Sequence, residues 1–310
     1  MKAEVSCKVC GGHGKALLTM PNDHGDPPFL DLFVCRRCRL VFVGTPVKEE
    51  QLVAAYATID WCAYYDEIAT SNASRIAAAL DDVVPLLRRR GERASLLDAG
   101  CGYGHFLEAV TRLHSPVRLR GHEFSLEEAR VAQAQGLSVY TGPLATITER
   151  FSVITLLDVA EHASDPVAVF RDCYELLEPG GHLYLHTPRR CLWDTIFMLL
   201  TKVRPVARVA RAWVRARLSI FHLQLWSDRA LRTALERAGF VVLELRRKRE
   251  LAWPVDRYAR VYLGDKLGIG PAGVRVGARL ADFAFNRVGV LRNKAVCIAQ
   301  KPVRAERALA

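Results

Sequence analysis

Hydrophobic residues follow two patterns along the chain, short continuous runs and helical spacing, and from residue 95 onward these two patterns alternate. Between short apolar runs lie segments with apolar residues three and four positions apart, a spacing that predicts amphipathic helices. One more such segment, residues 73–90, precedes the first strand and ends at Gly91. The runs that predict strands are residues 96–99, 117–123, 137–141, 151–158, 183–188, 240–245 and 294–300. This alternation predicts an α/β protein with a parallel, doubly wound sheet.

Capping residues mark where the predicted helices begin and end. Ser125 followed by Glu128 has the spacing of a capping box,. Asp165 followed by Pro166 starts a helix that we expect to reach residue 177, because aspartate is a preferred cap and proline suits the first turn,. The glycines of residues 178–181 predict a turn into the next strand,.

A run of alternating glycines follows the first strand of the predicted sheet. Residues 98–104 read D-x-G-x-G-x-G, and glycine at alternate positions lets the backbone take positive φ and lets a ligand approach closely,. Glu123 ends the second strand about 20 residues later, where an acid can accept hydrogen bonds from ribose hydroxyls,. A nicotinamide cofactor is the rival interpretation, but the third glycine of G-x-G-x-x-G is missing.

The glycine stretch resembles motif I of class I S-adenosylmethionine-dependent methyltransferases. The later series of strand, Glu161-His162, Asp165-Pro166, helix, P-G-G and strand is similar to the same series in that family. The resemblance implies a Rossmann-like sheet of seven strands and an enzyme that transfers a methyl group from S-adenosylmethionine. It implies cofactor contacts from Asp98, Gly100, Cys101, Gly102, Gly104, Glu123, Phe124, Leu157, Asp158 and, before the sheet, Tyr64.

Two histidines are candidates for the base that removes a proton from the methyl acceptor. His162 directly follows the fourth strand, and His222 lies in a segment that we expect to close over the acceptor,. Either histidine can instead be structural. Asp158, Glu161 and His162 also have a spacing that can hold a divalent cation, as in the quinone O-methyltransferases that this segment resembles,.

Four of the nine cysteines form two C-x-x-C pairs. Cys7 with Cys10, and Cys35 with Cys38, predict a zinc ribbon in which four thiolates hold one structural Zn²⁺,. The intervening loop is rich in Asp, Gly and Pro and can bring the pairs together.

The formal net charge of +11 allows nucleic acid, an anionic surface or an acidic substrate as partner,. Residues 189–217 add a specific feature, a helical face with Arg204, Arg208, Arg211, Arg215 and Arg217 opposite apolar groups. We interpret it as a substrate lid or as a peripheral contact with an anionic membrane surface. The chain has no apolar run near the roughly 20 residues of a membrane helix and no signal-like start, so we expect a cytoplasmic protein,.

These observations predict a ribbon at residues 1–47, a helical cofactor-covering segment at 48–93, a methyltransferase core at 94–301 and a tail at 302–310. The basic lid 189–222 and the basic segment 246–293 are insertions in that core. We expect a small-molecule acceptor, with oxygen favoured over carbon. An RNA methyltransferase and a non-catalytic zinc scaffold are the alternatives, but no N-P-P-aromatic loop follows the fourth strand, so we do not expect nucleic acid as partner.

Overall fold

The computed structural model describes residues 5–56, 58–59, 63, 66–113, 117–250, 255–265, 267–288 and 292–303. The chain divides into two compact units, each assembled from several segments. We call one the ribbon unit (Met1–Asn72, Pro188–Ala230 and Arg247–Ala295) and the other the sheet unit (Ala73–Thr187, Leu231–Arg246 and Val296–Ala310). The predicted lid and the basic segment after residue 246 therefore belong to the same compact unit as the cysteine ribbon.

The sheet unit is built on seven described strands in the order β10-β11-β8-β7-β4-β5-β6. The pairs β4·β5, β4·β7, β5·β6 and β7·β8 are parallel, and Asp98 of β4 is opposite Gly121 on one side and Thr155 on the other. The predicted doubly wound α/β sheet is therefore confirmed. Its strands are β4 (Ser95–Ala99), β5 (Arg118–His122), β6 (Val139–Tyr140), β7 (Phe151–Leu157), β8 (Leu177–Pro188), β10 (Val241–Lys248) and β11 (Lys294–Gln300).

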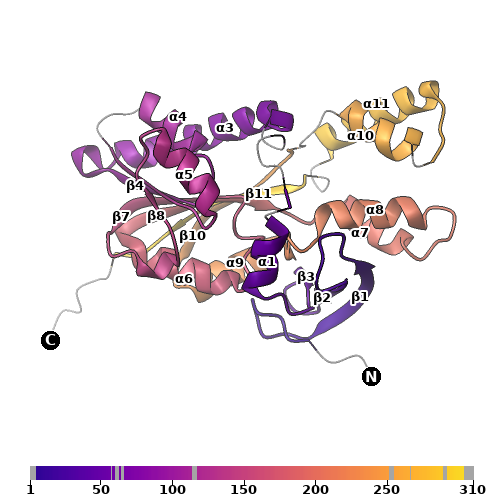
Figure 1. Ribbon diagram of the computed structural model, residues 1–310, viewed down its shortest axis with the longest axis horizontal. Coiled ribbons are helices and arrows are strands. Elements are labelled where there is room, and N and C mark those ends of the chain that lie inside the picture. The colour runs from indigo at the N-terminus through magenta and orange to yellow at the C-terminus, as the bar shows by residue number, and fades with distance from the viewer. Residues whose placement is uncertain are drawn as a thin grey trace. The chain divides into compact units, whose positions relative to one another are not determined.

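Helices cover both faces of this sheet (Figure 1). One face carries α3 (Ala69–Arg88), α4 (His105–Leu113) and α5 (Leu126–Ala134), and the other carries α6 (Pro166–Leu176) and α9 (Asp228–Arg237). Helix α3 buries Val83 and Leu87 in the same cluster as Leu96 of β4 and Leu107 of α4. Strands covered on both faces need near-continuous apolar sequence, which explains why most residues of β4 and β7 are apolar,.

The capping residues behave largely as the sequence predicts. Ser125 accepts a hydrogen bond from the backbone N–H of Glu128 at 3.4 Å, and Asp165 accepts from Val167 and Ala168 at 3.1 Å each. The prediction of a separate turn at 178–181 is wrong. These residues lie within β8, which follows α6 directly and bulges so that Phe151 pairs with Leu177 but Val153 with His182.

The ribbon unit contains a second sheet, whose described strands are antiparallel in the order β1-β2-β3-β9. The fourth strand is supplied from far along the chain, because Val41 of β3 pairs with Leu225 of β9. Leu32 of this sheet shares a core cluster with Met198 and Val214. The strands are β1 (Gly14–Pro21), β2 (Phe29–Cys35), β3 (Val41–Val43) and β9 (Gln224–Leu225).

Helices form the remainder of the ribbon unit. They are α1 (Glu49–Tyr56), α7 (Leu192–Leu200), α8 (Ala207–Arg217), α10 (Val255–Ala259), the π-helical turn η3 (Arg260–Asp265) and α11 (Pro271–Arg287), and short 3₁₀ turns η1 (Gly91–Arg93) and η2 (Leu144–Thr146) lie in the sheet unit. None of the helices in the described ranges is long and apolar enough to cross a bilayer.

The basic face predicted for residues 189–217 is smaller than its sequence suggests. Arg217 is half-buried and donates from Nε to Asp194 Oδ1 at 3.0 Å, while Trp213 donates to the same oxygen at 3.0 Å. Arg215 lies 3.2 Å from the carboxylate of Asp23. Arg204, Arg208 and Arg211 remain exposed. Arg217 thus fastens α8 to α7 rather than contributing to a solvated surface, because a buried guanidinium needs a counter-charge.

Candidate active site and metal centre

The glycine stretch forms a tight turn between β4 and α4. Gly100, Gly102 and Gly104 have φ values of 79°, 53° and 84°, a region that other residues occupy only with strain,. A Cβ on Gly100 would lie 2.4 Å from Val159, and one on Gly104 would lie 2.1 Å from Leu137 Cδ1. The backbone N–H of Gly100 donates to the carbonyl of His122 at 2.7 Å, which ties the turn to the end of β5.

Glu123 lies against this turn at the end of β5. Its Oε2 accepts from the N–H of Gly102 and its Oε1 from the N–H of Ser125, each at 2.9 Å. These bonds fix the carboxylate beside the glycines, and a carboxylate has about four acceptor positions, so capacity for two ribose hydroxyls remains. This geometry fits the role that the sequence predicts for Glu123.

Asp98 is buried at the carboxyl end of β4. Thr155 Oγ1 of the neighbouring β7 donates to Asp98 Oδ1 at 2.6 Å. Burial raises the pKa of Asp98 to about 7, and the charge of Glu123 adds to this shift while the Thr155 hydrogen bond and Arg75 oppose it. A cation that binds at this edge of the sheet would therefore favour the ionised form of Asp98.

The carboxyl end of β7 carries Asp158, a non-glycine residue with a φ of +56°. Its side chain forms an ion pair with Arg75 of α3 and lies 3.1 Å from Nδ1 of the buried His186 on β8. Sequence reasoning missed Arg75 and His186. Arg75 occupies an ordinary polar position of an amphipathic helix and belongs to no motif. His186 lies inside an apolar strand, where a polar residue is unusual, and this was the one sequence signal that could have indicated a functional role.

Glu161 and His162 follow in the next loop. Glu161 is fully buried and accepts a hydrogen bond from Thr187 Oγ1 at 2.9 Å, and its Oε1 lies 4.0 Å from Nε2 of the half-buried His162. Asp158 makes its ion pairs with Arg75 and His186 instead. Among the described residues, Glu161 and His162 fall in one group of possible metal ligands and Asp158 in another with His186, so the three predicted cation ligands do not share one site.

The other predicted site residues occupy varied positions. Cys101 packs its side chain into the core, Phe124 is exposed, and Leu157 is half-buried at the end of β7. Tyr64 lies outside the described residues. His222 belongs to the ribbon unit, in a turn where its N–H donates to Ser219 Oγ at 3.3 Å. The cofactor and catalytic roles of these residues remain predictions.

A cavity of ≈ 770 Å³ lies elsewhere in the sheet unit. Arg93 precedes β4 and His182 lies in the first half of β8, so this cavity is at the edge where the parallel strands begin. Ligands of doubly wound sheets bind outside the carboxyl ends of the strands, at the point where strand order reverses. That point is between β4 and β7, where the glycine turn and Asp158 lie.

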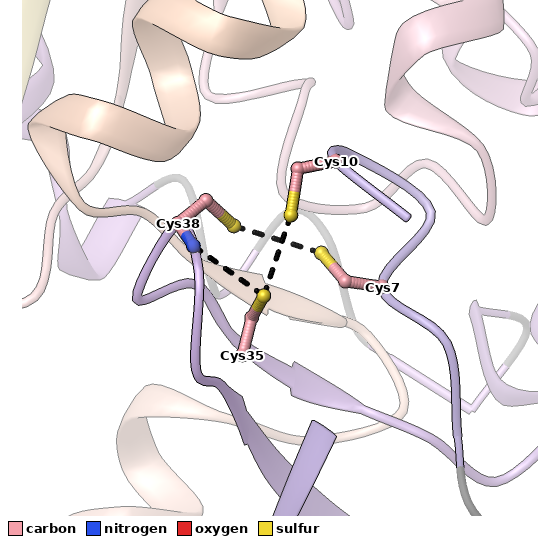
Figure 2. A group of neighbouring side chains, drawn as sticks. All are labelled: Cys7, Cys10, Cys35 and Cys38. Atoms are coloured by element: carbon pink, nitrogen blue, oxygen red, sulfur yellow. Dashed lines mark hydrogen bonds between the residues drawn. The ribbon is translucent and has the colours of Figure 1, made fainter. Parts of the chain in front are cut away.

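The four cysteines of the ribbon unit converge, as Figure 2 shows, although the two pairs come from segments 25 residues or more apart. The Sγ atoms of Cys7 and Cys38 are 3.6 Å apart, those of Cys10 and Cys35 are 3.4 Å apart, and all four lie within 4.8 Å of one another. Four sulfurs at about 2.3 Å from a tetrahedral Zn²⁺ would be about 3.8 Å apart. The described sulfur positions therefore fit a closed Zn(Cys)₄ centre.

Comparison with known proteins decides the family. Residues 71–245, more than half of the chain, match the family described as methyltransferase domain. The chain belongs to this methyltransferase family. The matched span contains the glycine turn, Glu123 and Asp158, whereas the cysteine centre precedes it. A solved S-adenosylmethionine-dependent methyltransferase from Archaeoglobus fulgidus is 13% identical, with a TM-score of 0.51 over 78% of this chain and 100% of that one, and it has the same fold.

Curated relatives match a shorter stretch of the methyltransferase. The ubiquinone biosynthesis O-methyltransferase of Xanthomonas oryzae pv. oryzae is 35% identical over 111 residues, which cover 31% of this chain and 44% of the relative. The enzyme of the same name from Parvibaculum lavamentivorans is 36% identical over 116 residues, which cover 35% of this chain and 46% of the relative. The chain thus spans less than half the length of these relatives.

Proposed function

We propose that this protein transfers the methyl group of S-adenosylmethionine to a small-molecule acceptor, with a hydroxyl oxygen as the favoured acceptor atom. The observation that carries the proposal is the positive-φ glycine turn hydrogen-bonded to Glu123 at the reversal point of the sheet. Membership of the methyltransferase family supports the reaction type. The name of the curated relatives, O-methyltransferase, supports oxygen as acceptor.

Each residue at this edge has a task in binding the cofactor. The turn of Gly100, Gly102 and Gly104 would leave room for its amino-acid part, and Glu123 would accept hydrogen bonds from its ribose hydroxyls. Asp98, when ionised, adds negative potential where the cofactor brings positive charge. When bound, the cofactor supplies an electrophilic methyl group, and the protein aligns donor and acceptor about 3 Å apart.

His162 is our first candidate for the general base, and His222 is the second. His162 follows β7 at the edge where the cofactor would bind, and Oε1 of the buried Glu161 lies 4.0 Å from its Nε2. A neutral imidazole beside a carboxylate can take a proton from a hydroxyl near neutral pH.

The cysteine centre is proposed to hold a structural Zn²⁺ with no part in the chemistry. Four thiolates leave no open coordination position for substrate, which is typical of structural zinc. Its contribution would be to hold the ends of β1 and β2 together in a sheet that has a small core of its own,.

Calorimetry and an activity assay test this function together. S-adenosylmethionine should bind the protein, and S-adenosylhomocysteine should form with a panel of aromatic or sugar hydroxyl compounds but not with matching amines. No detectable binding would refute the methyltransferase proposal, and transfer only to RNA would refute the small-molecule acceptor.

H162N should lower kcat about 100-fold with unchanged cofactor affinity. A loss confined to H222N would move the base to His222.

A further inference from the structure

The segment 267–288 of the ribbon unit exposes an unusual amount of apolar side chain. Helix α11 and the residues beside it lie beyond residues 71–245, so the family match does not account for them. A few scattered apolar residues on a surface are normal, but a contiguous set indicates a binding face. The exposed large apolar residues of this segment are Leu267, Ile269, Val276, Leu280, Phe283 and Val288.

Helix α11 contacts its unit along one side and is exposed along a neighbouring side. A Cβ on Gly277 would lie 2.4 Å from Leu263 of η3, so this side of α11 is in close contact with the rest of its unit. Val276, Leu280 and Phe283 are 58%, 65% and 64% exposed. Their spacing of four and three residues places them in one stripe, about a quarter of a turn around the helix from Gly277. The stripe therefore belongs to a helix that its unit already holds in place.

Arginines border this apolar stripe. Arg275, Arg279 and Arg287 are exposed, and Arg287 lies 5.9 Å from the centre of the Phe283 ring. None of these three arginines has a carboxylate within 4.0 Å among the residues that the structure describes. Asp282, an acid of the same helix, is paired with Arg249 at 2.7 Å. The exposed side of α11 therefore combines apolar side chains with arginines that form no ion pair within the described part of the chain, although Asp256 and Asp282 line the same hollow as Arg279 and Arg287.

This combination distinguishes between the surfaces that could cover the stripe. A second copy of the chain would bring the same arginines toward each other, and like charges at a contact oppose association. A bilayer with anionic headgroups offers apolar depth for Val276, Leu280 and Phe283 and phosphates for the arginines. We propose that α11 is a membrane-docking helix that lies in the interface of an anionic phospholipid bilayer.

Vesicle co-sedimentation of the full-length protein without cofactor tests this proposal independently of methyl transfer. The protein should sediment with phosphatidylcholine vesicles that contain phosphatidylglycerol and about tenfold less with phosphatidylcholine alone. The double variant L280S/F283S should partition about tenfold more weakly, and R275Q/R279Q should lose the preference for anionic vesicles. All four positions are exposed, so these variants should fold normally, which circular dichroism checks.

Controls separate this helix from other surfaces. L126S/L243S removes two leucines of the sheet unit with similar exposure, 59% and 53%, and should leave partitioning unchanged. R208Q/R211Q removes exposed arginines of α8 and should have a smaller effect than R275Q/R279Q. Equal sedimentation with neutral and anionic vesicles would overturn the proposal, as would wild-type binding by L280S/F283S. Dimerisation that L280S/F283S abolishes, without vesicle binding by the wild type, would assign the stripe to a second copy instead.

Discussion

Substituting Gly104 by alanine tests the geometry of the cofactor turn directly. Two physical effects add at this position. The φ of 84° disfavours any residue with a Cβ by about 1–2 kcal/mol,. The new methyl would also lie 2.1 Å from Leu137 Cδ1, and Leu137 packs against the core, so its displacement costs a further about 1–3 kcal/mol,. We expect G104A to lower the free energy of unfolding by about 2–5 kcal/mol.

Gly136 provides a matched control for the first effect. It has the same φ of 84° in the same unit, but a Cβ added there would have no atom within 4 Å among the described residues. G136A should therefore lower the free energy of unfolding only by the conformational part, about 1–2 kcal/mol. Urea unfolding at constant pH measures both variants, with equal m-values as the condition for comparing them.

A third variant and a binding measurement complete this test. In the L137A background, G104A should lower the free energy of unfolding by no more than G136A does, because the Cδ1 atom of Leu137 that obstructs the new methyl group is gone. G104A should also weaken S-adenosylmethionine binding at least tenfold in calorimetry, whereas G136A should not. Equal destabilisation by G104A and G136A would refute the contact with Leu137, and unchanged cofactor affinity of G104A would refute the role of the turn.

Three further results are expected. E123Q should weaken S-adenosylmethionine binding about tenfold in calorimetry, since an amide offers one acceptor oxygen where the carboxylate offers two; unchanged affinity would contradict the ribose contact. C38S should lose the bound zinc in elemental analysis and unfold at lower temperature, whereas C191S, at another buried cysteine of the same unit, should keep it. Because the pKa of Asp98 is about 7 in the folded protein against 3.8 ordinarily, the folded state keeps this proton to higher pH. The free energy of unfolding of the wild type should therefore fall between pH 4 and 7 relative to that of D98N, by about 4 kcal/mol at most,. Parallel pH profiles of the free energy of unfolding for the two proteins would contradict the buried carboxyl.

The sheet unit was largely readable from the sequence because its signals are local. Strand β7 is an apolar run, α6 begins at Asp165 and Pro166, and the glycine turn is a motif with a mechanism. The predicted turn at 178–181 is wrong because these residues form a bulge within β8, between the pairs Phe151–Leu177 and Val153–His182, where the backbone of Gly180 and Gly181 bonds to Lys301. A bulge of this kind depends on the neighbouring strand, which local sequence does not reveal.

Contacts between distant segments were the part that the sequence did not reveal. Glu123 and the glycines were predicted together because a fixed spacing connects them. The ion pair of Asp158 with Arg75 joins residues 83 positions apart, and Arg217, predicted as a surface charge, is the half-buried partner of the buried Asp194. Such pairs follow from how helices dock on a sheet, and no periodicity within either segment encodes them.

The origin of strand β9 has a consequence for the order of events during synthesis. β3 pairs with β9, and about 180 residues separate the two strands in the chain. At about 5–20 residues per second, the ribosome takes roughly 10–40 s to make β9 after β3. During that interval β3 is an open strand edge able to pair with another nascent chain. A metal ion captured early by Cys7, Cys10, Cys35 and Cys38 would hold β1 and β2 in register through this wait, and zinc supply would then affect the yield of folded protein.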